Sequence, residues 1–359
     1  MLIVGFDLGK RKSQICGVDA EGNVVKRTQR RFNTTREGIT EAFADLGKCR
    51  ILIESSTSSE WVARWLERLG HEVIVGDPRF SPMYAQSHKK VKTDKRDALG
   101  LAKSLLMGAY QRAHRRSDKS REIQDSLLAR AALMRTRTKL INTVRSICES
   151  HGVIVPKCRG DAFAKTMLTT TELSAALADA LAPLVDSIIA VTTQLVAMDK
   201  ALDERAERDE STRLLVTARG VGTLTSLAFV AAIDDPTRFP SARHVTSYLG
   251  LVPSERNSGD SKRRPGAITK TGDPLVRTYL VEAAFNIMGP RAPDSPLKQW
   301  GHAIAAKSGS KLKAAVAVAR RLARVLFAMW RDNKPFEAAR TKPDSTQPVS
   351  TAGEERQAA

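Results

Sequence analysis

The first 76 residues alternate short apolar runs with turns and amphipathic segments. Apolar runs predict strands over residues 2–8, 13–19 and 24–32, the last two joined by the hairpin turn "AEGN". Helical periodicity with a threonine start and a glycine stop predicts a helix over residues 34–47. Two more strands, 50–56 and 71–76, flank a second helix at 58–70. Three consecutive strands followed by alternating helices and strands are the order of the α/β ribonuclease-H-like fold, which is an analogy drawn from element order.

Three further helices are predicted over residues 94–110, 118–150 and 172–208. In the last of these, apolar residues recur at alternating spacings of three and four from Leu181 to Leu202. This seam is typical of a coiled coil, and one helix of a bundle within the chain is the alternative. The pattern leaves open whether the partner helix is 118–150 or belongs to a second subunit.

The remainder predicts an α-rich domain and a polar end. We expect an α/β domain over residues 1–112, a helical coiled-coil region over 113–210, an α-rich domain over 211–336 and a disordered tail over 337–359. Near the start of the third part, "ARGVGTLTSLAFVAAI" places Gly220 and Gly222 before an apolar helix. This turn resembles the helix-hairpin-helix turn, whose backbone N–H groups bind a DNA phosphate, and a plain glycine-rich helix entry is the alternative.

The net charge of the chain indicates the kind of partner that it binds. The 359 residues carry a formal net charge of +19, with a pI of about 10.1, which implies an anionic partner and most commonly nucleic acid. No apolar run approaches the ~20 residues of a membrane span, so no membrane partner is expected. The opening segment does not resemble a signal peptide, and the four cysteines show no CxxC spacing. We therefore expect a cytoplasmic, nucleoid-associated protein without a zinc site.

Two acidic residues close predicted strands. Asp7 ends the first strand and Glu54 ends the fourth, "ILIE". A carboxylate in an apolar strand is unfavourable unless it is paired or binds a cation. In a ribonuclease-H-like order the first and fourth strands are neighbours, so the two carboxylates should lie close together.

A second acidic pair, Asp94 and Asp97, begins the helix at 94–110. Positions three apart share a helix face, so both carboxylates can point at one ion. The alternative is structural, with Asp94 capping the helix and Asp97 in its first turn. Taken with Asp7 and Glu54, the pair predicts a site for two Mg²⁺ ions about 4 Å apart. The basic residues around it are expected to hold nucleic acid: Lys89, Lys90, Lys92, Lys95 and Arg96.

These residues carry a family resemblance. The matching segments are "GFDLGK", "IES" at 53–55, "KTDKRDA" at 92–98, "RGVG", "YLGLVPSERNSG" and "ITKTGD". With them the chain resembles the insertion-sequence transposases of the IS-one-ten family, DEDD recombinases with a RuvC-like domain, over about residues 1–335. The resemblance implies that Asp7, Glu54, Asp94 and Asp97 form the metal-binding DEDD tetrad.

The resemblance also implies a second catalytic element and a guide. Family members use a serine of the C-terminal domain to cleave DNA and hold it as a phosphoserine, and a bridge RNA pairs with donor and target DNA. "NSG" stands where the family often has "SSG", so Ser258 is the expected nucleophile, with Ser254 and Ser261 as alternatives. Nearby cations are expected to contact the nucleic acid: Lys262, Arg263, Arg264, Lys270 and Arg277.

The acidic site and the serine loop are far apart in sequence. We expect them to meet only when the chain assembles, as a dimer or tetramer held by the coiled coil. Two other functions remain open. A RuvC-like junction nuclease would need the acids and metal-activated water alone, and a non-catalytic nucleic-acid-binding protein would need neither site intact.

Overall fold

The computed structural model describes residues 1–78, 93–170, 173–255 and 265–336. The chain divides into two compact units, Met1–Arg116 and Ser117–Ala359. The predicted tail, 337–359, lies outside the described residues. The expected three-part division of the chain stays a prediction.

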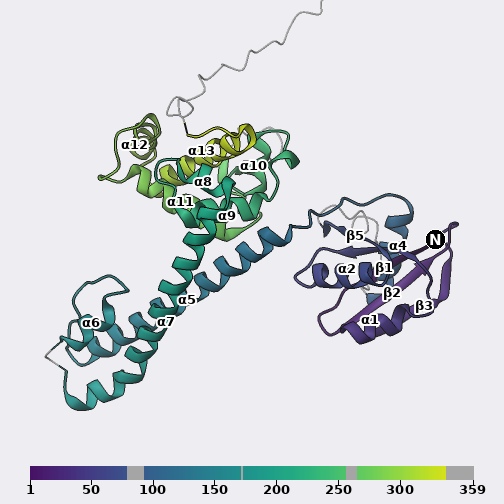
Figure 1. The fold of residues 1–359 in the computed structure, drawn as a ribbon, viewed down its shortest axis with the longest axis horizontal. Coiled ribbons are helices and arrows are strands. Elements are labelled where there is room, and N and C mark those ends of the chain that lie inside the picture. The colour runs from purple at the N-terminus through teal and green to yellow at the C-terminus, as the bar shows by residue number, and fades with distance from the viewer. Residues whose placement is uncertain (79–92, 171–172, 256–264, 337–359) are drawn as a thin grey trace, which may run out of the picture. The chain divides into compact units, whose positions relative to one another are not determined.

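The first unit is built on a five-stranded mixed sheet (Figure 1). Its strands are β1 (Leu2–Asp7), β2 (Lys12–Val18), β3 (Val24–Asn33), β4 (Cys49–Glu54) and β5 (Glu72–Gly76). Their order across the sheet is β3-β2-β1-β4-β5. The first three strands form an antiparallel meander, and β4 and β5 run parallel to β1. The predicted contact between the first and fourth strands is confirmed by their register, in which Phe6 pairs with Ile53.

Helices cover both faces of this sheet. They are α1 (Arg36–Phe43), α2 (Ser59–Arg68) and α4 (Asp94–Leu106). Because side chains alternate along a strand, Ile51 and Ile53 of β4 face one cluster, with Phe43 of α1 and Leu66 of α2. Leu52 faces the opposite cluster, with Leu101 of α4. The sheet therefore has α1 and α2 on one side and α4 on the other.

In the second unit two long helices form an arm, α5 (Asp118–Ser150) and α7 (Ala175–Arg208), with the short α6 (Phe163–Leu168) between them in sequence (Figure 1). They run antiparallel, since Leu127 near the start of α5 packs in one core cluster with Leu202 near the end of α7. Farther along α5, Val144 shares another cluster with Leu181. The predicted seam of α7 thus packs against α5 of the same chain.

The apolar character of α7 also bears on the membrane expectation. By length and composition alone α7 could cross a bilayer, a test that core helices pass as well. Its buried side chains, Leu181, Ile188 and Leu195 among them, pack within the protein. The helix is therefore weak evidence for a membrane partner.

Around the base of the arm the remaining helices form one core. They are α8 (Glu210–Val216), α9 (Thr223–Ile233), α10 (Ala242–Tyr248), α11 (Pro274–Met288), α12 (Pro296–Ser308) and α13 (Lys311–Asp332). The apolar α9 is buried along almost its whole length, at the centre of this core. Two short strands, β6 (Pro253–Glu255) and β7 (Pro265–Ile268), pair antiparallel. The sequence pattern predicts only a polar loop there.

Candidate active site

Asp7 and Glu54 lie at the same edge of the sheet. Each is the last residue of its strand, and β1 and β4 are adjacent and parallel. Their preceding residues, Phe6 and Ile53, are register partners, so the two acids occupy matching positions. Both side chains are half-buried. The structure thus places the two strand-end carboxylates as the sequence predicts.

The N-terminus of α4 is brought to this edge by a close approach between a helix and a strand. A Cβ built on Gly5 would lie 1.9 Å from the backbone oxygen of Ala98 and 2.4 Å from the backbone nitrogen of Ala102. Later residues of α4, including Leu105, pack beside Ile3 at the start of β1. The helix therefore runs opposite to β1, and its first turn lies toward the end of the strand that carries Asp7.

Asp94 and Asp97 lie in that first turn. Thr93 caps the helix, because its side chain accepts a hydrogen bond from the Arg96 backbone N–H. The idea that Asp94 is the cap is therefore wrong. Asp97 is half-buried, whereas the Asp94 carboxylate is exposed. Negative charge in the first turn of a helix is favoured by the helix dipole, so both acids suit this position.

An arginine that the sequence analysis overlooked contacts this acidic group. Arg31 of β3 forms an ion pair with Asp94, at 3.4 Å between Nη2 and Oδ2. Across the sheet, Arg31 pairs with Gln14 and Gln14 pairs with Asp7, so the arginine lies at the same level as the strand-end acids. Both partners are more than half exposed, and such a pair contributes about 0–1 kcal/mol. A metal ion could displace it at little energetic cost.

A fifth acid, Asp77, lies at the same edge and was also overlooked. It directly follows β5 and lines a small pocket together with Glu54. The sequence does contain a signal for this residue, because Asp77 directly follows an apolar strand, much as Asp7 and Glu54 are the last residues of apolar strands. The segment "DPRFSP" instead predicted only a loop.

The donor set suits a hard divalent cation, since Mg²⁺ prefers carboxylate oxygens. Within the described residues, however, no group of three or more acidic, histidine or cysteine side chains is close enough to hold one ion. The acids share an edge of the sheet without forming a compact cluster. The predicted cations Lys95 and Arg96 lie exposed in the same helix turn, whereas Lys89, Lys90 and Lys92 fall outside the described residues.

The serine loop is carried by the β6–β7 hairpin. Ser258 and Ser261, with Lys262, Arg263 and Arg264, lie between the two strands and outside the described residues. Ser254 is described, and its Oγ donates a hydrogen bond to the Ala267 carbonyl at 2.9 Å. It also lies against Gly266, where an added Cβ would come within 2.5 Å of the Ser254 Oγ. Ser254 therefore helps to pair the strands, which makes it a poor candidate nucleophile.

Two glycine turns hold the base of this hairpin. Gly250 and Gly272 both have positive φ, 67° and 73°, and each packs against the other segment. A Cβ on Gly250 would lie 2.2 Å from the Thr271 carbonyl oxygen, and one on Gly272 would lie 2.2 Å from that of Tyr248. The segments "YLGL" and "KTGD" are thus interlocked, and any larger residue would separate them.

Two cations predicted to contact nucleic acid differ in their surroundings. Arg277 donates from Nη1 to the backbone oxygens of Leu249, at 3.2 Å, and Thr271, at 2.6 Å. Burial lowers the pKa of Arg277. These bonds tie α11 to the glycine turns, a structural role. Lys270 is exposed and has a left-handed backbone, with φ of 56°.

The glycine pair before α9 leaves the start of that helix uncapped. Gly220 has φ of 77° and packs against Ile287, whose Cγ1 would lie 2.5 Å from an added Cβ. Gly222 is the N-cap residue, is exposed, and offers no side chain to the first N–H groups of α9. The contact of this helix start with a DNA phosphate stays a prediction of the turn motif.

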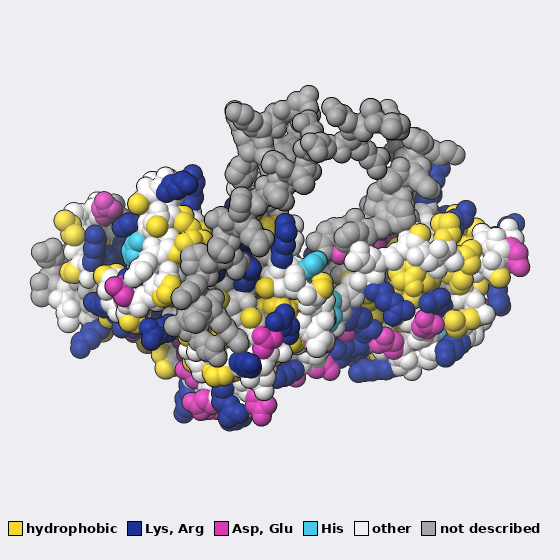
Figure 2. All heavy atoms as spheres, turned by 90° about the horizontal axis from the view of Figure 1, so that it is seen from above, with side chains coloured by type: hydrophobic (Ala, Val, Ile, Leu, Met, Phe, Trp, Pro, Cys, Tyr) yellow, Lys and Arg dark blue, Asp and Glu magenta, His cyan; other side chains and the backbone are white. Residues whose placement is uncertain are grey.

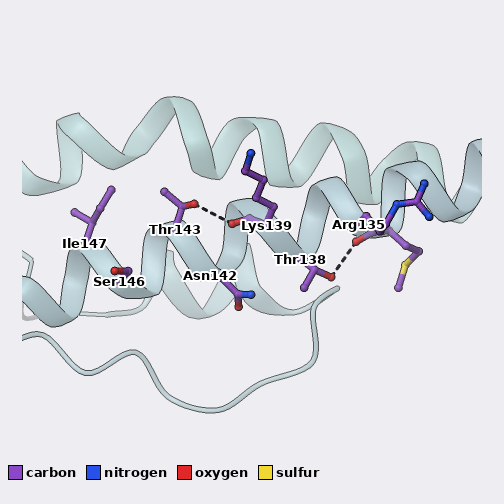
Figure 3. A pocket seen from close by; sticks show the side chains of 8 residues that line it. Arg135, Thr138, Lys139, Asn142, Thr143, Ser146 and Ile147 are labelled. Carbon is purple, nitrogen blue, oxygen red and sulfur yellow. Dashed lines mark hydrogen bonds between the residues drawn. The ribbon is translucent and has the colours of Figure 1, made fainter.

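A separate open pocket lies along α5 (Figure 3). Its lining comes from one helix: Met134, Arg135, Thr138, Lys139, Asn142, Thr143, Ser146 and Ile147. The hydroxyls of Thr138 and Thr143 donate to the backbone of the preceding turn. Among the described residues that line it, none is a carboxylate.

Comparison with known proteins decides the family. A model of the DEDD transposase domain, described as "Transposase", matches residues 4–151, and one described as "Transposase IS116/IS110/IS902 family" matches residues 212–297. The transposase for insertion sequence element IS1328 of Yersinia enterocolitica is 27% identical over 93% of this chain and 98% of its own length. A Sinorhizobium fredii protein whose name describes it as a transposase is 30% identical over 80% of this chain and 72% of its own. This chain belongs to the IS110/IS116/IS902 transposase family.

A third relative of this transposase is named for gene inversion. The pilin gene-inverting protein of Moraxella bovis is 27% identical over 80% of this chain and 81% of its own length. The segment that matches the DEDD domain, residues 4–151, contains all four predicted acids. The segment that matches the second family description, residues 212–297, contains the β6–β7 hairpin. The transposase is thus a DNA-acting recombinase whose DEDD domain implies a RuvC-like fold and a divalent metal.

On the face shown in Figure 2, Lys and Arg side chains are spread over the surface among hydrophobic and polar ones.

Proposed function

We propose that this transposase cuts and rejoins the DNA of an insertion sequence through a metal-dependent acidic site and a covalent phosphoserine. In this proposal Asp7, Glu54, Asp94 and Asp97 hold divalent metal, with Mg²⁺ as the ion and two as the number. Ser258 is the nucleophile. An element-encoded RNA guides the choice of donor and target DNA.

One observation carries the proposal. Asp7 and Glu54 end two adjacent parallel strands, and Gly5 lets the backbone of α4 approach closely enough to bring Asp97 to the same edge. Carboxylate oxygens are the ligands that Mg²⁺ prefers, so acids that share one edge of the sheet can contribute ligands to one metal site.

The residues would divide the reaction between them. Bound Mg²⁺ would neutralise charge on the attacked phosphate and assist ionisation of the attacking hydroxyl. The Ser258 hydroxyl would lose its proton as its oxygen bonds to phosphorus, and the P–O bond that breaks would release a DNA strand end whose oxygen takes up a proton. The phosphoserine ester would conserve the bond energy needed for rejoining. The uncapped N-terminus of α9 and the exposed Lys270 would hold neighbouring phosphates.

We also propose that several subunits associate to form the active enzyme. The seam of α7 is occupied by α5, yet apolar residues on the outer faces of the arm are exposed, including Leu128 at 47% and Val196 at 63%. These faces could join two or more subunits. The dimer or tetramer, the guide RNA and nucleoid association are parts of the proposal.

Covalent trapping tests the chemistry. Protein purified together with its bound RNA, mixed with DNA bearing an element end and Mg²⁺, should give a protein–DNA adduct that survives denaturation. Ser258→Ala should abolish the adduct, and Ser254→Ala should keep it. Asp7→Asn should reduce cleavage by about 10³-fold or more while DNA binding remains. Glu41→Gln, an exposed carboxylate change on α1, is the matched control.

The outcomes separate the alternatives. An adduct that persists in Ser258→Ala would assign the nucleophile elsewhere. Cleavage without any adduct would point to a junction nuclease that uses water. Sequencing the RNA that purifies with the protein, expressed with its flanking DNA, tests guidance. A discrete RNA from the flank supports it, and random host RNA opposes it.

A further inference from the structure

Arg31 lies on the same face of the sheet as the first acid of the candidate site. Asp7 pairs with Gln14 across β1 and β2, and Gln14 pairs with Arg31 across β2 and β3. Residues directly opposite each other on neighbouring strands point to the same face of a sheet. Gly5, two residues before Asp7, meets α4, so this is the face that α4 covers. Two strand spacings, about 10 Å, separate the backbones of Arg31 and Asp7.

The guanidinium of Arg31 reaches from the edge strand to the first turn of α4. Its Nη2 lies 3.4 Å from Oδ2 of Asp94. This separation is longer than the usual hydrogen-bond distance of about 2.7–3.2 Å, and the two side chains are 62% and 58% exposed. The guanidinium therefore holds Asp94 loosely, and it keeps N–H donors available for a second ligand.

The preceding residue, Arg30, shows how a structural arginine of the same strand is held. Arg30 points to the opposite face of the sheet, where Nη1 and Nη2 donate to the two carboxylate oxygens of Asp45, both at 2.6 Å. Nη1 also donates to the Ala42 carbonyl at 2.9 Å. These bonds tie β3 to the end of α1, and the hydrogen bond to Asp45 raises the pKa of Arg30. Among the described residues, Arg31 has no such paired bond.

In the proposed function Asp94 is a metal ligand, so a metal ion and Arg31 compete for the same carboxylate. A divalent ion carries twice the charge of a guanidinium, and carboxylate oxygens are the ligands that Mg²⁺ prefers. Metal binding would therefore release Arg31 beside a bound cation. A guanidinium in that place needs an anion, and the anion that reaches the metal in DNA cleavage is a backbone phosphate.

We propose that Arg31 is a substrate contact that holds a backbone phosphate of the DNA at the acidic site once metal has replaced it at Asp94. The inference rests on the proposed function, because it needs a metal ion at Asp94. A guanidinium suits the task, since it donates two parallel N–H bonds to the oxygens of one phosphate. An exposed ion pair without a function is the alternative, and it predicts no effect of Arg31 on metal or DNA binding.

Mn²⁺ titration tests the competition for Asp94. Isothermal titration calorimetry of the full chain without DNA compares wild type with Arg31→Gln and Arg31→Lys. Loss of the competing charge should tighten Mn²⁺ binding by about twofold to fivefold in Arg31→Gln, whereas Arg31→Lys should stay close to wild type. Lys48→Gln is the charge-matched control, because Lys48 is exposed and precedes β4, at the end of that strand opposite to Glu54.

Salt titration of DNA binding tests the phosphate contact. Protein purified together with its bound RNA is mixed with DNA bearing an element end, with Ca²⁺ in place of Mg²⁺ to slow cleavage. In Arg31→Gln the slope of log K against log [salt] should fall by about one, and affinity should fall roughly threefold to tenfold. Arg31→Lys should keep the slope, because it keeps the charge, and Lys48→Gln should match wild type.

The proposal predicts effects of opposite sign in one variant, with tighter Mn²⁺ binding and weaker DNA binding in Arg31→Gln. A merely structural arginine would not give this combination, since a damaged fold weakens both. A change in only one of the two measurements would overturn the proposal, as would wild-type values in both. Failure of the wild type to bind Mn²⁺, or Mn²⁺ binding that Asp94→Asn leaves unchanged, would instead overturn the proposed metal site, and the role of Arg31 with it.

Discussion

His71 links the stability of the first unit to pH through one buried ring. The ring packs against Phe43, with 5.0 Å between centroids, and its Nδ1 accepts a hydrogen bond from the Cys49 backbone N–H at 3.2 Å. Protonation of Nδ1 would remove this acceptor. Burial accordingly lowers the pKa of His71 from its ordinary value of 6.5. Folding therefore favours the neutral form of this ring.

The sign of the pH effect follows. Below pH 6.5 the unfolded chain binds a proton that the folded chain resists, so stability falls as pH drops from 6.5 toward the lower folded value. Above 6.5 His71 has no effect on the pH dependence. In melting curves between pH 7.5 and 5.5, wild type should lose stability more steeply than His71→Asn, whose Oδ1 can accept the same bond. Parallel losses in the two proteins would exclude His71 as the cause.

At the scale of elements, the contact between α4 and β1 decides whether the acids meet. Only glycine at position 5 lets the backbones of β1 and α4 touch, because a Cβ there would overlap the Ala98 carbonyl oxygen. The apolar residues of α4 would still drive it onto the sheet, but at a greater distance. Asp97, one residue before Ala98, would then move away from the strand-end acids.

Gly5→Ala should therefore impair both stability and cleavage. We expect a loss of about 1–3 kcal/mol in the free energy of unfolding, typical of an overpacked core, measured by urea titration. Mg²⁺-dependent cleavage should fall more steeply than DNA binding. Gly47→Ala is the control, because nothing lies within 4 Å of its added Cβ. Unchanged stability in Gly5→Ala would mean that α4 does not rest on β1 as described.

At the scale of the whole molecule, the acidic site and the serine hairpin belong to different compact units. The acids lie within Met1–Arg116 and the hairpin within Ser117–Ala359. A reaction that needs both must bring the acidic site of one unit to the serine hairpin of the other. The two units can belong to the same chain or to two different subunits, and a mixing experiment distinguishes these cases.

Mixing two inactive variants distinguishes these cases. Asp7→Asn lacks a working acidic site, and Ser258→Ala lacks the nucleophile. If active centres form between the subunits of a dimer, the co-expressed variants should give about a quarter of the wild-type amount of adduct. Random pairing makes half of the dimers mixed, and each mixed dimer has one intact centre out of two. If each centre forms within one chain, every centre carries a defect and no adduct should form. Either variant expressed alone is the control.

Local sequence patterns determined much of this protein. Strands, helices and the acids that end them follow from the spacing of apolar residues and from caps such as Thr93, because these signals involve neighbours in the chain. The family motifs added the likeness to known transposases. The interlocked glycines and the short β6–β7 pair were not predicted, because each depends on a separate segment farther along the chain rather than on its own residues.

Only the tertiary structure decided which distant residues meet. The seam of α7 was clear in the sequence, but its partner, α5, depends on how the chain folds back. The ion pair of Arg31 with Asp94 joins β3 to α4, and the strand-end position of Asp77 acquires meaning only beside Glu54. Such pairs are set by long-range packing and strand register, and local periodicity contains no information about them.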